Sequence, residues 1–219
     1  MYRHFMNKNG EKPIVPVMDH LLWIADYIDS ATFVKISSWN RADFDRPRHD
    51  DDFLGMRFAN QILHGYATHD HHDFENCMLD KYRLVGLDTE MWKGIQINFK
   101  DNKSMRLMEE LKILDADGKI DEFILVNENS QAGNISINPV TDKKIIKMNI
   151  SPRNTVIDWH LVMQMALENH HVSTSTFFIM QAIQNQFHFT SKVFLYPRPN
   201  EDGLRGISQL IPDFKYEIK

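Results

Sequence analysis

The sequence predicts an α+β fold in which a helical N-terminal part packs on a mixed or antiparallel sheet. Two observations carry this prediction. Apolar residues recur at helical spacing in the first half, whereas short apolar runs between turn signals dominate the second half. A chain of 219 residues with 42% hydrophobic residues is large enough to bury a core. We expect a single domain over 1–219, mainly helical over 1–91 and sheet-rich over 92–219.

Three segments of the first half have the apolar spacing of helices. The first is 13–28, the second is 53–67 with Asp52 as its N-cap, and the third is 74–82. The stretch 37–52 is polar and charged and predicts a loop.

The segment from 94 to 150 alternates between apolar runs and turn signals. GIQINF at 94–99 and EFILV at 122–126 predict strands, and Ser104 predicts the start of a short helix between them. Residues 135–150 predict a hairpin, because two alternating runs flank the turn NPVTDK.

The last third predicts one helix and two strands. Ser151 and Pro152 are typical of a helix start, and the apolar spacing continues to about Asn169. A long strand is expected over 176–194, where apolar and polar residues alternate, and a short one over 214–218. One face of the long strand carries only neutral hydrogen-bonding groups, which indicates a surface that contacts a ligand. These groups are Gln184, Gln186, His188 and Thr190.

The composition argues against several classes of function. The 25 basic and 30 acidic residues give a net charge of −5, which disfavours a nucleic-acid binder that works by bulk charge. No apolar run approaches the ~20 residues that cross a bilayer, and the N-terminus lacks the apolar core of a signal peptide. The single Cys77 excludes an intrachain disulfide and a cysteine-based zinc cluster. We therefore expect a soluble cytoplasmic protein with no membrane partner.

Two stretches of the second half carry a family likeness: DKKIIKMNISPRNTVIDWHLVM at 142–163 and NQFHFTSKVF at 185–194. Together with the ending YPRPNEDGLRGISQLIPDFKYEI, they resemble the C-terminal half of the thymidylate synthase superfamily, especially the phage-type pyrimidine hydroxymethylases. The resemblance implies a thymidylate-synthase-like fold, a homodimer and a pyrimidine nucleoside monophosphate as ligand. If the family chemistry is retained, it also implies one-carbon transfer with a folate cofactor.

The nucleotide-binding hypothesis assigns substrate-binding roles to seven residues. Arg153 follows a predicted strand inside a helix start, where backbone N–H groups and a guanidinium converge on an anion. By the same resemblance, Arg106 in the SMR element would reach the phosphate from the partner subunit. The assigned residues are Arg106, Arg153 and Asn154 for the phosphate, His188 and Thr190 for the sugar, and Gln164 or Gln184 for the base edge.

The chain departs from the family at the catalytic position. The nucleophilic cysteine of the family would fall near Ala132, and Cys77 lies too far upstream to serve in its place. Thr155 and Val156 stand where the family has an aspartate, and Thr190 stands where it has a tyrosine. Because the family adds its one-carbon unit only after a thiolate attacks C6 of the pyrimidine, that route lacks its nucleophile here. A degenerate, binding or regulatory role is as consistent with the sequence as catalysis.

Two other functions are consistent with the sequence. Imidazoles and carboxylates are dense between His49 and His72, as in a metal-dependent phosphohydrolase or nuclease that binds Zn, Mn or Ni. A solvated loop explains the same residues without a metal. The candidate ligands are His64, His69, Asp70 and His72. The third function is a non-enzymatic viral assembly or interaction protein, which the small size of the chain fits.

Overall fold

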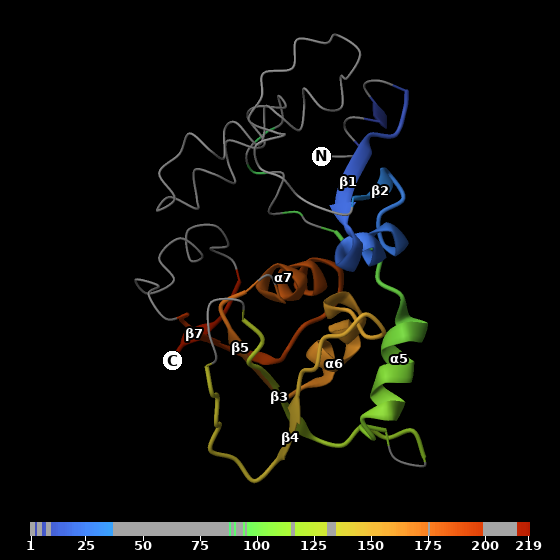
Figure 1. Cartoon of the computed structure of the whole chain (residues 1–219). Coiled ribbons are helices and arrows are strands. Elements are labelled where there is room, and N and C mark those ends of the chain that lie inside the picture. Colours follow the sequence, from blue (N-terminus) through green and yellow to red (C-terminus); the bar gives the residue numbers. More distant parts are fainter. Residues whose placement is uncertain are drawn as a thin grey trace. The chain divides into compact units, whose positions relative to one another are not determined.

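The computed structural model describes residues 10–36, 96–114, 117–130, 135–174, 176–198 and 214–219, together with the single positions 3, 6, 7, 88, 90 and 94. The chain forms two compact units, Met1–Lys93 and Gly94–Lys219. Figure 1 labels most of the helices and strands of both units. Within the described residues, no helix combines the length and the apolar character that a membrane span requires.

The described part of the first unit is a two-stranded parallel sheet joined by a 3₁₀ helix. Strand β1 (Ile14–Met18) pairs with β2 (Thr32–Ile36), and η1 (Asp19–Asp26) connects them. The helix predicted over 13–28 is therefore wrong over its first part. The β-branched residues of β1 favour an extended backbone, and Pro16 lacks the N–H that a helix interior requires. The helices predicted over 53–67 and 74–82 lie outside the described residues.

The described part of the second unit is built on a five-stranded sheet in which every neighbouring pair is parallel. The strands are β3 (Phe123–Asn127), β4 (Lys144–Lys147), β5 (Glu168–Val172), β6 (Lys192–Tyr196) and β7 (Glu217–Ile218), and their order in the sheet is β4-β3-β5-β6-β7. The combination of helices with a sheet is confirmed. The prediction of a mixed or antiparallel sheet is wrong, because the chain returns to the same end of the sheet before each new strand.

The hairpin predicted over 135–150 does not form. Strand β4 pairs with β3 in parallel, and residues 135–140 adopt no regular secondary structure. Instead, Ile137 packs against Ile124 and Val126 of β3. The alternation over 135–140 thus comes from a segment that covers the sheet rather than from a strand within it.

The long strand predicted over 176–194 is a helix followed by a strand. Helix α7 covers Thr176–Gln186, and β6 begins only at Lys192. The error has a physical cause, because α7 is buried around most of its circumference over its first two turns. A helix that is apolar on nearly every side cannot be distinguished from a strand by its periodicity alone. Its buried apolar residues are Phe177, Ile179, Met180, Ala182 and Ile183.

The helix predicted over 151–169 is shorter than expected. It consists of η3 (Val156–Trp159) and α6 (His160–Met165), after which the chain enters β5. The start lies at Thr155 rather than Ser151, because Thr155 and Asp158 form a reciprocal capping box.

Four further predictions concern one helix and three strands of the second unit. The helix expected near Ser104 is confirmed as α5 (Asp101–Glu110), and the strands expected over 122–126 and 214–218 correspond to β3 and the shorter β7. The strand expected over 94–99 is wrong, because neither Gly94 nor residues 96–99 belong to a strand.

Helices α5, α6 and α7 lie on the same side of the sheet (Figure 1). Helix α6 contacts both α5 and α7. One bond ties each helix to that face: the Lys144 ammonium donates to the Leu111 carbonyl after α5 at 3.2 Å, the Asn169 amide donates to the Met163 carbonyl of α6 at 2.9 Å, and the Asn127 amide donates to the Thr176 hydroxyl of α7 at 3.3 Å. Ile137 packs on the other face, and the described residues of the β3–β4 connection, 128–130 and 135–143, form no helix. Both placements agree with right-handed crossovers.

We expect Leu125→Ala to destabilise the protein by about 2–5 kcal/mol, because Leu125 is fully buried in the interior strand β3 and its truncation leaves a cavity. Ile145→Ala is the matched control. Ile145 lies in the terminal strand β4 and is 44% exposed, so its truncation should cost only about 0.5 kcal/mol. Urea unfolding followed by circular dichroism measures both values. Equal losses would contradict the central place of β3 in the core.

Candidate functional site

The order of the strands reverses at one point of the sheet. After β3 the chain turns to one side to form β4, and after β4 it crosses to the other side to form β5. Counted from β3, the sheet has the order 2-1-3-4-5 of doubly wound folds. In open parallel sheets of this kind, ligands bind outside the carboxyl ends of the strands at the reversal, here between β3 and β5.

Four polar side chains meet at the carboxyl ends of β3 and β5, and we call them the switch-point cluster: Asn127, Asn129, Thr174 and Thr176. The Asn127 amide donates to the Thr176 hydroxyl at 3.3 Å, and the hydroxyls of Thr174 and Thr176 share a hydrogen bond of 2.9 Å. The Asn127 carbonyl accepts from the Asn129 side-chain amide at 2.8 Å and from its backbone N–H at 3.1 Å. The cluster therefore forms one continuous hydrogen-bonded chain from β3 to the start of α7.

The cluster has a buried and an accessible part. Asn127 and Thr176 are buried, whereas Thr174 is half-buried and Asn129 is exposed. Helix α7 begins at Thr176, so the N–H groups of its first turn and the positive end of its dipole lie at this edge of the sheet. Two accessible hydrogen-bonding side chains thus stand beside a helix N-terminus, and the buried pair fixes their base.

Reasoning from the sequence did not find the switch-point cluster. Because residues 176–194 were interpreted as a strand, Thr174 and Thr176 were not recognised as lying at a helix start. The signal that could have found them is the run Ser-Thr-Ser-Thr at 173–176, since hydroxyl residues directly before the first apolar residues of a helix are typical of helix N-termini.

The three residues assigned to the phosphate lie together on the surface of the second unit. The Arg106 guanidinium donates to the Asn154 side-chain carbonyl at 3.3 Å and to the Arg153 carbonyl at 3.5 Å. Glu110 accepts from the Arg153 guanidinium at 2.6 Å and lies 3.6 Å from that of Arg106. These contacts form within one chain, and Glu110 offsets part of the positive charge that an anion would need.

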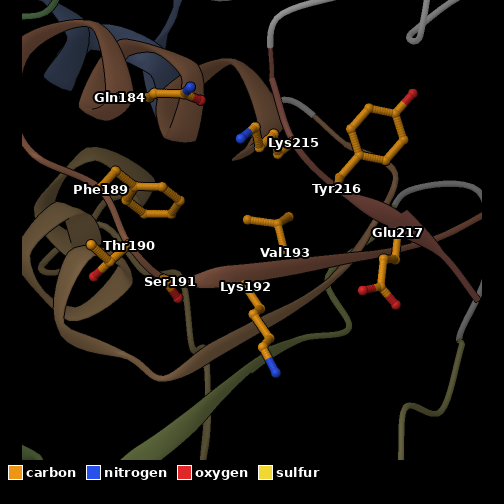
Figure 2. A pocket seen from close by; sticks show the side chains of 9 residues that line it. All are labelled: Gln184, Phe189, Thr190, Ser191, Lys192, Val193, Lys215, Tyr216 and Glu217. Carbon is orange, nitrogen blue, oxygen red and sulfur yellow. The ribbon is translucent and has the colours of Figure 1, made fainter.

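The remaining assigned residues lie in two other places. The Gln164 amide donates to the backbone carbonyl of His188 at 3.4 Å, so this contact does not involve the imidazole. Gln184 and Thr190 line a pocket at the amino end of β6 (Figure 2). Arg106, Arg153 and Asn154, which were assigned to the phosphate, therefore lie apart from the pocket that Gln184 and Thr190 line.

Two histidines follow each other in β5 and face opposite sides of the sheet. On the side away from the helices, His170 lies 3.0 Å from both the Glu168 carboxylate and the Tyr196 hydroxyl. Because a carboxylate only accepts, the imidazole Nε2–H donates to Glu168, and in the neutral imidazole Nδ1 then accepts from the Tyr196 hydroxyl. Burial, with a further contribution from Glu168, raises the pKa of the Tyr196 hydroxyl, so the phenol stays protonated at neutral pH.

His171 lies on the helix-covered side and is fully buried. Its Nε2 lies 3.4 Å from the side-chain carbonyl of Asn169, and its Nδ1 has no hydrogen-bond partner among the described residues. Burial, and then the neighbouring His170, lowers the pKa of His171 from 6.5 to about 3. His171 is therefore neutral in the folded protein at physiological pH.

The metal-site hypothesis concerns residues that the structure does not describe. His64, His69, Asp70 and His72 lie outside the described residues, so their role stays a prediction. Among the residues that the structure describes, no three His, Cys, Asp or Glu side chains are grouped so that they could hold a metal ion.

We expect the stability of the protein to fall as the pH drops below 6.5. Between 6.5 and about 3 the unfolded chain protonates His171 while the folded chain does not, so the unfolded state binds more protons. At pH 5 this one group should cost about 2 kcal/mol relative to pH 7. The measurement is the free energy of unfolding of wild type and His171→Leu at both pH values.

The variant should lose about that much of its pH dependence, whereas His188→Gln, which alters an exposed histidine, should keep the pH dependence of wild type. An unchanged pH dependence in His171→Leu would contradict the neutral, buried state.

Comparison of the chain with protein-family models, with curated proteins and with solved structures finds no match. The thymidylate-synthase-like fold is not confirmed, and the relation to that superfamily stays a prediction.

Proposed function

We propose that this protein binds a nucleotide at the switch-point cluster, with the phosphate at the start of α7. The observation that carries the proposal is the reversal of strand order between β3 and β5, with accessible hydrogen-bond donors at that point. The proposal keeps the class of ligand that the sequence resemblance implies and moves the phosphate from Arg153 to Thr174.

The start of α7 has the chemistry that a phosphate requires. A phosphate oxygen is favoured by the positive end of a helix dipole and by N–H groups that have no partner within the helix. The Thr174 hydroxyl adds a donor, because it can rotate from Thr176 to a ligand oxygen. Asn129 stands on the β3 side of the same edge, where its side-chain amide donates to the Met148 and Asn127 carbonyls, so the group that it offers to a ligand is its side-chain carbonyl, an acceptor.

The buried pair beneath the site gives it a fixed shape. Asn127 is fully buried and bonds to the first residue of α7, so it holds the end of β3 at a set distance from the helix start. A site whose donors are held before the ligand arrives loses less conformational entropy on binding. This arrangement favours a specific ligand over a loosely held anion.

The surface arginines support the phosphate role less well. Arg153 donates to Glu110 at 2.6 Å and is 69% exposed, so a ligand phosphate would compete both with a carboxylate and with water. Exposed pairs of this kind contribute little binding energy. Pyrimidine nucleotides remain the first ligands to test, because the sequence likeness is to enzymes that act on them.

One-carbon transfer remains a separate hypothesis. A thiol nucleophile for that chemistry is missing from the described residues, since the single cysteine, Cys77, lies outside them. The proposed function is therefore binding, and it requires neither a folate nor a thiol.

The test is isothermal titration calorimetry with UMP, dUMP, dCMP and their nucleosides. We expect Thr174→Val to weaken the binding of the nucleotides by about tenfold or more, because it removes a hydrogen bond to a charged group. The same variant should leave the weaker binding of the nucleosides unchanged, because they carry no phosphate.

Thr190→Val is the matched control, since it removes an exposed threonine hydroxyl at the opposite end of α7. Its nucleotide affinity should equal that of wild type. Loss of affinity in Thr190→Val but not in Thr174→Val would move the nucleotide to the pocket that Thr190 lines. Loss of nucleotide affinity in Arg153→Ala alone would show that the phosphate binds at Arg153 instead. If no nucleotide binds at all, the proposal is overturned.

A further inference from the structure

The second unit has a pocket of about 300 Å³ far from the switch-point cluster. It lies where α7 ends and where β6 and β7 begin, so the length of α7 separates it from Thr176. Eleven helical residues at 1.5 Å each make that separation about 16 Å. One small ligand therefore cannot contact both the pocket and the switch-point cluster.

The pocket has an apolar base and a polar mouth. Val193 forms the base, because it points to the helix-covered side of β6 and is buried. The ring of Phe189 lies beside it, and the side-chain ends of Gln184 and Lys215 point toward each other above (Figure 2). An apolar base with a few convergent polar groups is typical of small-molecule sites.

Of the charged side chains that border the pocket, only some point into it. Lys192 and Glu217 also border it, but in Figure 2 both side chains point away, to the other side of the strands. This agrees with their register, because Lys192 alternates with Val193 along β6, and Glu217 pairs with Phe194 on that other face. Lys215 is the cation that points inward, and no described residue forms an ion pair with it.

We propose that this pocket binds a small aromatic carboxylate. The planar ring would lie on Val193 against Phe189, where aromatic side chains favour stacked or edge contacts. The carboxylate would face the Lys215 ammonium, and the Gln184 amide would donate to the same group. A pocket of this volume holds one ring with a short polar substituent. The inference does not depend on nucleotide binding at the switch-point cluster.

The test is a titration of the ¹⁵N-labelled full chain with sodium benzoate, followed by ¹H–¹⁵N spectra. We expect saturable shifts in the amides that line the pocket, including those of Gln184, Val193 and Lys215. Lys215→Gln should weaken benzoate about threefold to fivefold, the size of effect that an exposed ion pair gives. Gln184→Ala should weaken it as well, and both positions are exposed, so the fold should tolerate the changes.

Two controls separate a site from general charge attraction. Lys192→Gln removes the neighbouring lysine that points away, and it should leave benzoate affinity unchanged. Benzamide, which has the same ring without the charge, should bind wild type more weakly than benzoate does, and this difference should disappear in Lys215→Gln. Equal losses in the two lysine variants, equal affinity of benzamide and benzoate for wild type, or the absence of saturable shifts at the pocket would each overturn the proposal.

Discussion

The second unit depends on one constraint, the complete burial of β3 on both faces. Its five residues are at most 3% exposed, so water reaches neither side of the strand. A buried strand must pair its backbone groups on both edges and must have both faces covered. Strands β4 and β5 flank it, the helices cover one face, and Ile137 covers the other. The reversal of strand order follows, because β3 lies in the interior of the sheet although it is the first of its strands in the chain.

Two buried asparagines of this core connect one element to another. Asn127 joins the end of β3 to the start of α7, and Asn169 joins β5 to Ser191 just before β6, at 2.6 Å. Each side-chain amide thereby fixes one end of the crossover that contains α7. The two proposed binding places lie at these two ends. Their geometry is therefore set by buried hydrogen bonds rather than by the exposed loops around them.

Part of this structure could be predicted from local sequence, and the rest depends on tertiary contacts. The run EFILV predicts β3 because a continuous apolar stretch suits a strand buried on both faces. The parallel pairing of β3 with β4 could not be predicted, since it depends on the path of the connection 128–143 rather than on the pattern of either strand. The helical conformation of α7 could not be predicted either, because a nearly fully buried helix has no polar face from which its period of about 3.6 residues can be recognised.

The candidate sites likewise divide into residues that a local sequence pattern identifies and residues that only tertiary contacts bring together. Gln184 and Thr190 were identified as contact residues from a pattern that was wrongly taken for a strand, and both line the pocket because α7 ends where β6 is about to begin. The contact of Arg106 with Arg153 and Asn154 joins residues 47 and 48 positions apart, which no local pattern predicts. The switch-point cluster required the strand order, a property of the whole sheet.

The two strands that end the described sheet have features that oppose pairing with the strands of another chain. An exposed strand edge offers unpaired backbone groups to another chain, and proteins limit this hazard with short edge strands and with lysines. Strand β7 has only two residues, and β4 begins and ends with Lys144 and Lys147 around its two isoleucines. Lys144 is held by the carbonyls after α5, and Lys147 by Glu128, so both charges are fixed beside the apolar residues. The same residues that close the sheet thus act against edge-to-edge aggregation.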